Sequence, residues 1–136
     1  MTTSRYATPV EAEEAFYAAF EAADLAAMMA IWAQHESITC IHPLGPMLVG
    51  RGAIEQSWQA IFGQSVSMKF KVERRCEAQD GSLAVHVVYE HIQVTGEQQS
   101  HTVIATNAYR LTAGGWCMIL HHASPDPRSV KEPTLH

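Results

Sequence analysis

The second half of the chain carries a strand pattern that no helical pattern interrupts. Four runs alternate apolar and polar side chains, as strands with two unlike faces do: residues 66–78, 82–95, 100–111 and 116–123. Asp80-Gly81, Gly96-Glu97 and Gly114-Gly115 separate the runs, and short turns of this kind join antiparallel neighbours. The second half is therefore predicted to form one antiparallel sheet.

Helical patterns are confined to the first half. Thr8-Pro9-Val10-Glu11 is a capping box with proline at the first helical position, which predicts a helix over residues 9–23. Asp24 is a favoured N-cap residue, and apolar side chains at helical spacing after it predict a second helix over residues 25–33. Two of the three expected helices thus follow each other directly.

A strand over residues 37–42, a loop rich in proline and glycine, and a third helix over residues 51–62 complete the first half. Helices early and strands late predict an α+β domain, because a βαβ fold would alternate them. Long, bent antiparallel strands with three helices on one face would form a half-open cone with a pocket at its mouth. We expect one domain over residues 1–136, with a core at about 8–125 and a loose tail at 126–136.

Composition argues against several classes of function and location. The formal net charge of −5 at pH 7 disfavours nucleic-acid binding, which depends on neutralising phosphates. No stretch approaches the roughly 20 apolar residues of a membrane span, and the start of the chain lacks the apolar region of a signal peptide. Cys40, Cys76 and Cys117 are odd in number and lack CxxC spacing, so we expect free thiols in a reducing cytoplasm.

The histidines do not form a metal-binding pattern. Neither HExxH nor a cupin-type HxH spacing occurs, so neither a metal nor another cofactor is predicted. His121 and His122 are adjacent on a predicted strand and must point to opposite faces. By phase with Met118 and Leu120, we expect His122 to be the one that faces inward.

Several short stretches occur in the order and spacing typical of one protein family. They are Ala22-Ala23-Asp24-Leu25 before Trp32-Ala33, Ile41-His42-Pro43, Gly50-Arg51-Gly52-Ala53-Ile54, the strand at 106–111 and the ending at 116–125. Together they resemble the SnoaL-like and ketosteroid-isomerase-like branch of the nuclear-transport-factor-2-like superfamily, over roughly residues 8–125. The resemblance implies the half-open cone of that superfamily, also called cystatin-like.

The resemblance also implies pocket positions. The isomerases place a general-base aspartate where this chain has His42, and a protonated acid that donates to the developing oxyanion where it has Asn107. They place the oxyanion-hole tyrosine where this chain has Phe16, and tyrosine or phenylalanine at Trp32 and Trp58. Because Phe16 has no hydroxyl, steroid isomerisation does not carry over from the likeness of fold.

The residues themselves allow acid–base chemistry. The imidazole of His42 can take and return a proton near pH 7, and Cys40 shares its strand face. Asn107 offers an amide donor on an otherwise apolar face, where it could stabilise an enolate oxygen or tie two strands together. An indole N–H could replace the missing tyrosine as a weaker donor. The expected pocket wall is Phe16, Phe20, Trp32, Trp58, Tyr89, Met118, Leu120 and His122.

Three functions follow from this pattern. The chain could be an isomerase, dehydratase or cyclase that moves a proton on a small hydrophobic carbonyl compound, or a non-catalytic binder of such a molecule. It could also be an interaction module, because the outward set on the later strands is too apolar for free solvent and predicts a homodimer through the sheet face. That outward set is Thr102, Ile104, Thr106, Ala108, Cys117 and Ile119.

Overall fold

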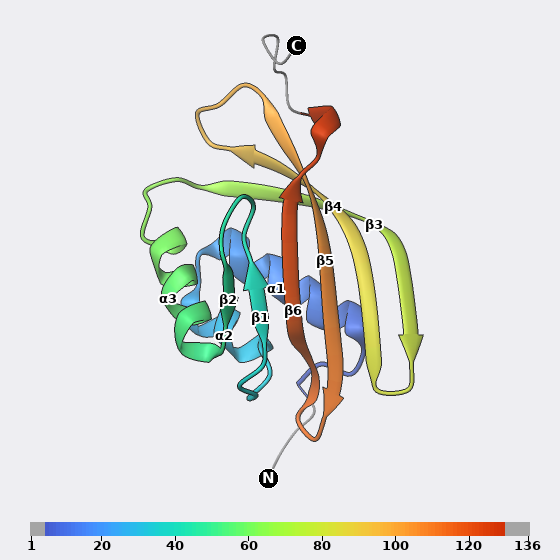
Figure 1. Ribbon diagram of the computed structural model, residues 1–136. Helices are drawn as coiled ribbons and strands as arrows, with labels where there is room; N and C mark the ends of the chain where they lie inside the picture. Colours follow the sequence, from blue (N-terminus) through green and yellow to red (C-terminus); the bar gives the residue numbers. More distant parts are fainter. Residues whose placement is uncertain (1–4, 130–136) are drawn as a thin grey trace.

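A computed structural model describes residues 5–129 and joins three α-helices to one curved, six-stranded sheet (Figure 1). In chain order the elements are α1 (Pro9–Ala22), α2 (Leu25–Ile31), β1 (Thr39–Ile41), β2 (Met47–Val49), α3 (Arg51–Phe62), β3 (Met68–Asp80), β4 (Leu83–Val94), β5 (Ser100–Thr112), β6 (Gly115–Pro125) and the 3-10 turn η1 (Pro127–Ser129). The strand order is β2-β1-β6-β5-β4-β3. Only the β1–β6 pair is parallel.

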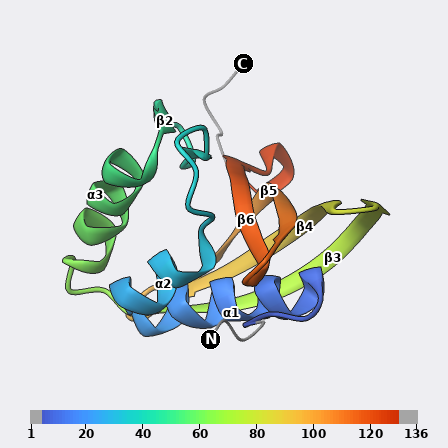
Figure 2. The same cartoon turned by 90° about the horizontal axis from the view of Figure 1, so that it is seen from below.

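The three helices lie on one face of the sheet, as the α+β cone requires. Figure 2 shows α1 and α2 along the base and α3 standing away from β3 and β4. We call the sheet face towards α1 the inner face and the opposite one the outer face. The core between helices and inner face contains Phe16, Met28, Ile31, Ile54, Trp58, Val88, Ala105, Tyr109 and Met118, all buried.

Side-chain caps fix the starts of the first two helices. Thr8 Oγ1 accepts from the Glu11 amide at 3.1 Å, and the Glu11 carboxylate accepts from the Ala7 amide at 2.9 Å. The first bond satisfies a backbone donor that the first turn leaves free, so Thr8 is the N-cap. The predicted capping box is only half formed, because Glu11 accepts from the amide before Thr8 and not from the Thr8 amide. Asp24 caps α2 in the same way, at 3.0 Å. That helix ends at Ile31, two residues before the predicted end.

The segment at 32–38 leaves the helical path at Trp32 and is held from two sides. Trp32 already has extended backbone angles, and the Ala33 amide donates to a β6 carbonyl at 2.9 Å. The Arg51 guanidinium donates to the carbonyls of Met29, Trp32 and Ala33, at 3.0, 3.0 and 3.3 Å. Charge-assisted bonds of this kind are strong, so the segment is anchored to both α3 and the sheet.

The short strand β2 lies inside the predicted loop and was not predicted. Its three residues pair antiparallel with β1, where Met47 lies opposite Ile41 and Val49 opposite Thr39. Both Met47 and Val49 are exposed. Three residues with exposed apolar ends do not make an alternating pattern, whereas the neighbouring prolines and glycines indicate a loop.

The strand β4 places Tyr89 on the face opposite to the expected one. Ala84, His86, Val88 and Glu90 are buried on the inner face, whereas the more apolar row of Leu83, Val85, Val87 and Tyr89 lies outside. The placement of Tyr89 in the pocket wall was therefore wrong. Its hydroxyl accepts from Arg128 at 2.8 Å on the outer face. The prediction failed because the outer row of this strand is the more hydrophobic of the two.

A β-bulge in β6 reverses the phase of its second half. Ala108 of β5 pairs with Leu120 and Tyr109 pairs with Met118, which leaves Ile119 as an extra residue. An inserted residue shifts every later side chain to the other face. His121 is therefore buried on the inner face and His122 is exposed. The inward placements of His122 and Leu120 were both wrong for this reason.

The chain remains ordered for a few residues beyond the sheet. Asp126 is buried, and its amide donates to the Thr102 carbonyl at 2.9 Å. Residue 126 of the expected loose tail is thus held against the sheet, and residues 130–136 lie outside the described residues. Within residues 5–129, every helix is too short or too polar to cross a bilayer.

Candidate functional site

His42 follows β1 directly and lies beside α3. Its Nε2 is 2.9 Å from the Ser57 hydroxyl oxygen, and that hydroxyl donates to the Ile54 carbonyl at 2.7 Å. Because a serine hydroxyl has only one hydrogen, His42 Nε2 must carry the hydrogen of its bond to Ser57. The lone pair is then on Nδ1. Cys40 shares the face of His42, as predicted, with Sγ 3.6 Å from Nε2.

Burial determines the protonation states of the His42 imidazole and the Cys40 thiol. His42 is half-buried, and loss of hydration lowers the pKa of its imidazole below the usual 6.5. The ring is therefore neutral near pH 7 and can accept a proton. Burial raises the pKa of the Cys40 thiol to about 12, with a smaller contribution from Glu90. That thiol is not a nucleophile near neutral pH.

Four buried polar side chains form a hydrogen-bonded chain through the cone, which we call the polar chain. Each comes from a different element: Tyr17 from α1, Glu90 from β4, Asn107 from β5 and His121 from β6. His121 Nδ1 lies 2.6 Å from Asn107 Oδ1, Asn107 Nδ2 donates to the Tyr17 hydroxyl at 3.1 Å, and that hydroxyl donates to Glu90 Oε2 at 2.5 Å. Since Asn107 Oδ1 can only accept, His121 Nδ1 is the donor. All donors thus point towards Glu90.

Burial also sets the charges along the polar chain. It raises the pKa of Glu90 to about 7, although the bond from Tyr17 acts in the opposite direction. It lowers the pKa of His121 to about 3, and the nearby imidazoles of His42 and His122 add to this effect. Near pH 7, His121 is therefore neutral, while Glu90 changes its charge close to this pH.

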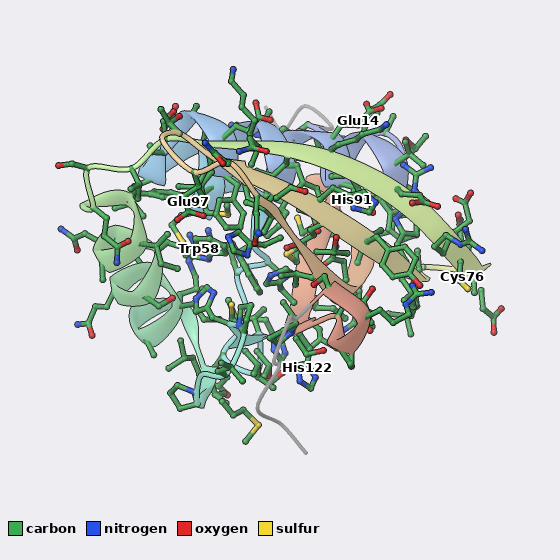
Figure 3. The ribbon with its side chains drawn as sticks, turned by 90° about the horizontal axis from the view of Figure 1, so that it is seen from above. Glu14, Trp58, Cys76, His91, Glu97 and His122 are labelled. Atoms are coloured by element: carbon green, nitrogen blue, oxygen red, sulfur yellow. The ribbon has the colours of Figure 1, made fainter. Side chains whose placement is uncertain are left out.

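Aromatic rings surround the polar chain and separate it from water. Phe16 contacts the Trp58 ring edge-on at 5.7 Å between centroids, and Phe20 contacts it at 4.8 Å. His42 also meets Trp58 edge-on, at 4.8 Å, and its centroid lies 6.4 Å from that of His121. Figure 3 shows Trp58 between α3 and the sheet. His42 and Asn107 thus both lie beside His121, which hydrogen-bonds Asn107 and whose ring faces that of His42 without a hydrogen bond.

Side chains fill the middle of the cone. Phe16, Trp58 and Asn107 are 0% exposed and His121 is 1% exposed. A wide pocket around these groups, as expected from the sequence, is therefore not confirmed. The part of the site that water reaches is the half-buried edge at His42.

The remaining predicted wall residues divide between two places. Phe16, Phe20 and Trp58 surround the polar chain, and Met118 is buried on the inner face. Trp32 is buried too, but it lines a cavity that opens on the outer face. The sequence therefore predicted the aromatic surroundings of the site better than its polar members.

Three members of the polar chain were missed, although a signal for Tyr17 was present. Glu13, Phe16, Tyr17 and Phe20 follow the spacing i, i+3, i+4, i+7 of one helical face. Glu13 is buried because its carboxylate binds Arg74 at 2.6 Å and His86 at 3.0 Å. A buried acid on this face indicates that the face is not purely apolar, and Tyr17 is the next polar residue along it.

No group of three or more His, Cys, Asp or Glu side chains within residues 5–129 is arranged to hold a metal ion.

Comparison with known proteins gives three informative matches. A family model for the SnoaL-like domain matches residues 10–127. A protein of Thiobacillus denitrificans, provisionally described as a calcium/calmodulin-dependent protein kinase type II association domain, is 41% identical; the match covers 89% of this chain and 97% of that one, with a TM-score of 0.85. A provisional dehydratase of the NTF2-like family from Streptomyces avermitilis is 30% identical, with coverages of 85% and 91% and a TM-score of 0.77.

A curated relative extends the comparison to plants. The F-box protein SKIP8 of Arabidopsis thaliana is 27% identical over 100 residues, which make up 74% of this chain and 42% of that protein. This chain therefore spans less than half the length of that relative.

Proposed function

The chain belongs to the SnoaL-like domain family, within the NTF2-like proteins that its sequence resembles, and we propose that it is an enzyme that moves a proton on a small hydrophobic carbonyl compound. The reaction would be of isomerase, dehydratase or cyclase type. The observation that carries this proposal is a neutral His42, reached by water and placed 6.4 Å from the end of the polar chain. The provisional dehydratase among the similar structures agrees with it.

His42 is the proposed base. Each of these reactions begins with removal of a proton from the carbon next to a carbonyl, and a base that is neutral near pH 7 suits that step. The bond to Ser57 holds Nε2, so Nδ1 is the atom that would take the proton. Burial lowers the pKa of His42, which keeps the base free of a proton at neutral pH.

The enolate oxygen formed in that step needs a hydrogen-bond donor. Trp58 Nε1 is buried and has no acceptor among residues 5–129. An indole only donates, so a ligand oxygen that enters beside His42 and displaces part of the packing around Trp58 would complete its bonding. Asn107 acts in this proposal as a positioning residue that holds His121 in one tautomer. Direct contact between its amide and a ligand stays a prediction.

The substrate in this proposal is small. Because the middle of the cone is filled, the reacting carbon would sit at the exposed edge of His42. Phe20 and Phe62 are half-buried beside Trp58 and would supply an apolar wall for it. No cofactor takes part, and free cysteines at 40, 76 and 117 favour a cytoplasmic location.

Deuterium exchange tests the proposal without knowledge of the final product. Purified protein is incubated in D₂O with a panel of small ketones and β-hydroxy ketones, and exchange next to the carbonyl is followed by mass spectrometry. We expect wild type to exchange at least one compound, His42→Ala to lose this activity, and the exposed His101→Ala to retain it. Exchange that persists in His42→Ala would end the assignment.

The same panel of compounds separates a non-catalytic binder from an enzyme when the unfolding temperature is measured beside deuterium exchange. A binder would raise the unfolding temperature with one of these compounds, because a ligand that binds only the folded state stabilises it. It would leave the deuterium content of that compound unchanged.

A second proposed role is self-association through the outer face. Leu83 is 48% exposed and Val85 41% exposed on the outer row of β4, and Val85 lies opposite Ala108 of the predicted outward set. The similar protein described as an association domain agrees with this role. We expect light scattering to give twice 15.0 kDa, and Val85→Glu to give a monomer. Val66→Glu, at an equally exposed site outside the sheet, is the control; a monomeric wild type at micromolar concentration would contradict the proposal.

A further inference from the structure

A cavity of about 840 Å³ opens on the outer face, away from the polar chain. It lies between the β5–β6 hairpin, at the bottom of Figure 1, and the segment at 32–38. The strand residues that line it, Arg110, Thr112, Cys117 and Ile119, alternate with the buried Tyr109, Trp116 and Met118 of the inner face. The sheet therefore separates this cavity from His42 and Asn107.

The walls of the cavity are fixed in place. The Arg5 amide donates to the Gly114 carbonyl at 3.0 Å, and the Trp116 amide donates to the Tyr6 carbonyl at 2.9 Å. Gly115 has φ +105°, and a Cβ there would lie 2.9 Å from the Tyr6 backbone, so only glycine allows this contact. The opposite wall is the segment that Arg51 binds. The cavity is thus preformed, as ligand sites usually are.

The lining combines positive charge with an apolar surface. Arg5 and Arg110 have no carboxylate partner among residues 5–129, and no Asp or Glu lines the cavity. This is notable in a chain whose formal net charge is −5. Trp32, Ile38 and Ile119 supply apolar surface, and the buried Trp32 Nε1 has no acceptor among the described residues.

We propose that this cavity binds an amphipathic carboxylate, a molecule with one anionic head group and a short apolar chain. Unpaired guanidinium groups favour a carboxylate, which they can bind with two parallel hydrogen bonds. The apolar chain would lie against Ile38 and Ile119, and its binding would change the fluorescence of Trp32. The site is independent of the proton-transfer site.

Titration calorimetry with octanoate, with octan-1-ol as the uncharged counterpart, tests this inference. We expect octanoate to bind once per chain with a dissociation constant below about 1 mM, and octanol at least about tenfold more weakly. Arg110→Gln should weaken octanoate about tenfold and Arg110→Lys less, because lysine keeps the charge without the planar fork. Lys69→Gln, which removes an exposed charge on β3, should leave the affinity within about twofold.

Two further measurements distinguish octanoate binding in this cavity from binding at the proposed proton-transfer site. His42→Ala should bind octanoate as wild type does, so failure of the proposed enzyme function would leave this inference standing. Octanoate should also change the tryptophan fluorescence of wild type but not that of Trp32→Phe. Equal binding of octanol and octanoate, or an unchanged affinity in Arg110→Gln, would overturn the inference. Cys117 and Ile119 line this cavity and also belong to the outward set proposed for self-association. Loss of octanoate binding on dimer formation would therefore overturn the inference too, since a second copy would then fill the cavity.

Discussion

Replacing Glu90 by glutamine should change how the free energy of unfolding depends on pH. Burial raises the pKa of Glu90 from 4.5 to about 7. Between these values the folded chain holds a proton that the unfolded chain has released, so Glu90 makes the free energy of unfolding fall as pH rises. His121 acts in the opposite direction, because burial lowers its pKa from 6.5 to about 3. Between about pH 3 and 6.5 the unfolded chain holds a proton on this histidine that the folded chain has released, so the free energy of unfolding rises with pH.

The two contributions overlap and cancel between about pH 4.5 and 6.5. One pKa unit corresponds to about 1.4 kcal/mol, so each contribution amounts to about 3 kcal/mol across that interval. In wild type these two groups together leave the free energy of unfolding nearly flat there. In Glu90→Gln only the histidine contribution remains. The free energy of unfolding of this variant should therefore rise by about 3 kcal/mol as the pH is raised from 4.5 to 6.5. The amide oxygen of glutamine can still accept from Tyr17, so the geometry is kept.

Urea unfolding followed by tryptophan fluorescence between pH 4.5 and 8 measures this difference. The matched control is Glu14→Gln, since Glu14 is an exposed acid on the outside of α1 (Figure 3). Its profile should run parallel to that of wild type. If the Glu90→Gln profile is also parallel to wild type within about 0.5 kcal/mol, Glu90 does not hold a proton at neutral pH. The charges assigned to the polar chain would then be wrong.

Three other changes follow from the geometry. Gly115→Ala should lower the free energy of unfolding by about 2 kcal/mol, measured in urea, because φ +105° is strained for alanine and its Cβ meets Tyr6. Arg51→Gln should cost about 3 kcal/mol in the same assay, because three buried carbonyls lose a charged donor. In alkylation at pH 8 followed by mass spectrometry, exposed Cys76 should react first and Cys40, whose pKa is about 12, only after unfolding; labelling of Cys40 in the folded state would contradict its burial.

Local signals in the sequence predicted most of the element boundaries. The N-caps at Thr8 and Asp24 depend on residues within one helical turn, and both are present. The Asp80-Gly81 turn behaves likewise, with Gly81 at φ +61° in the left-handed region that such turns require. Helix caps and tight turns depend on residues that are close in the sequence, so they can be predicted without knowledge of the fold.

The polar chain could not be predicted because it depends on strand register. Tyr17 and Glu90 are 73 residues apart, and Asn107 and Tyr17 are 90 apart. Their contact requires the inner face of β4, which the sequence does not indicate, since Leu83 and Val85 outside are more apolar than His86 and Glu90 inside. The placement of Tyr89 in the pocket wall followed the same outer row. His42 and Asn107 were found through a family resemblance, which already contains that register.

The bulge at Ile119 decides which of two identical neighbours joins the polar chain. His121 binds Asn107 because the bulge takes up Ile119 as an extra residue of β6, and His122 is left in contact with water. Deleting Ile119 would remove the extra residue and leave a regular strand, in which His121 still lies opposite Asn107 on the inner face and His122 opposite Thr106 on the outer face. In relatives of this chain, equivalent histidines should therefore be assigned by counting residues from the end of the strand. A relative without the bulge has one residue fewer, so an alignment that omits a gap at residue 119 would compare side chains from opposite faces.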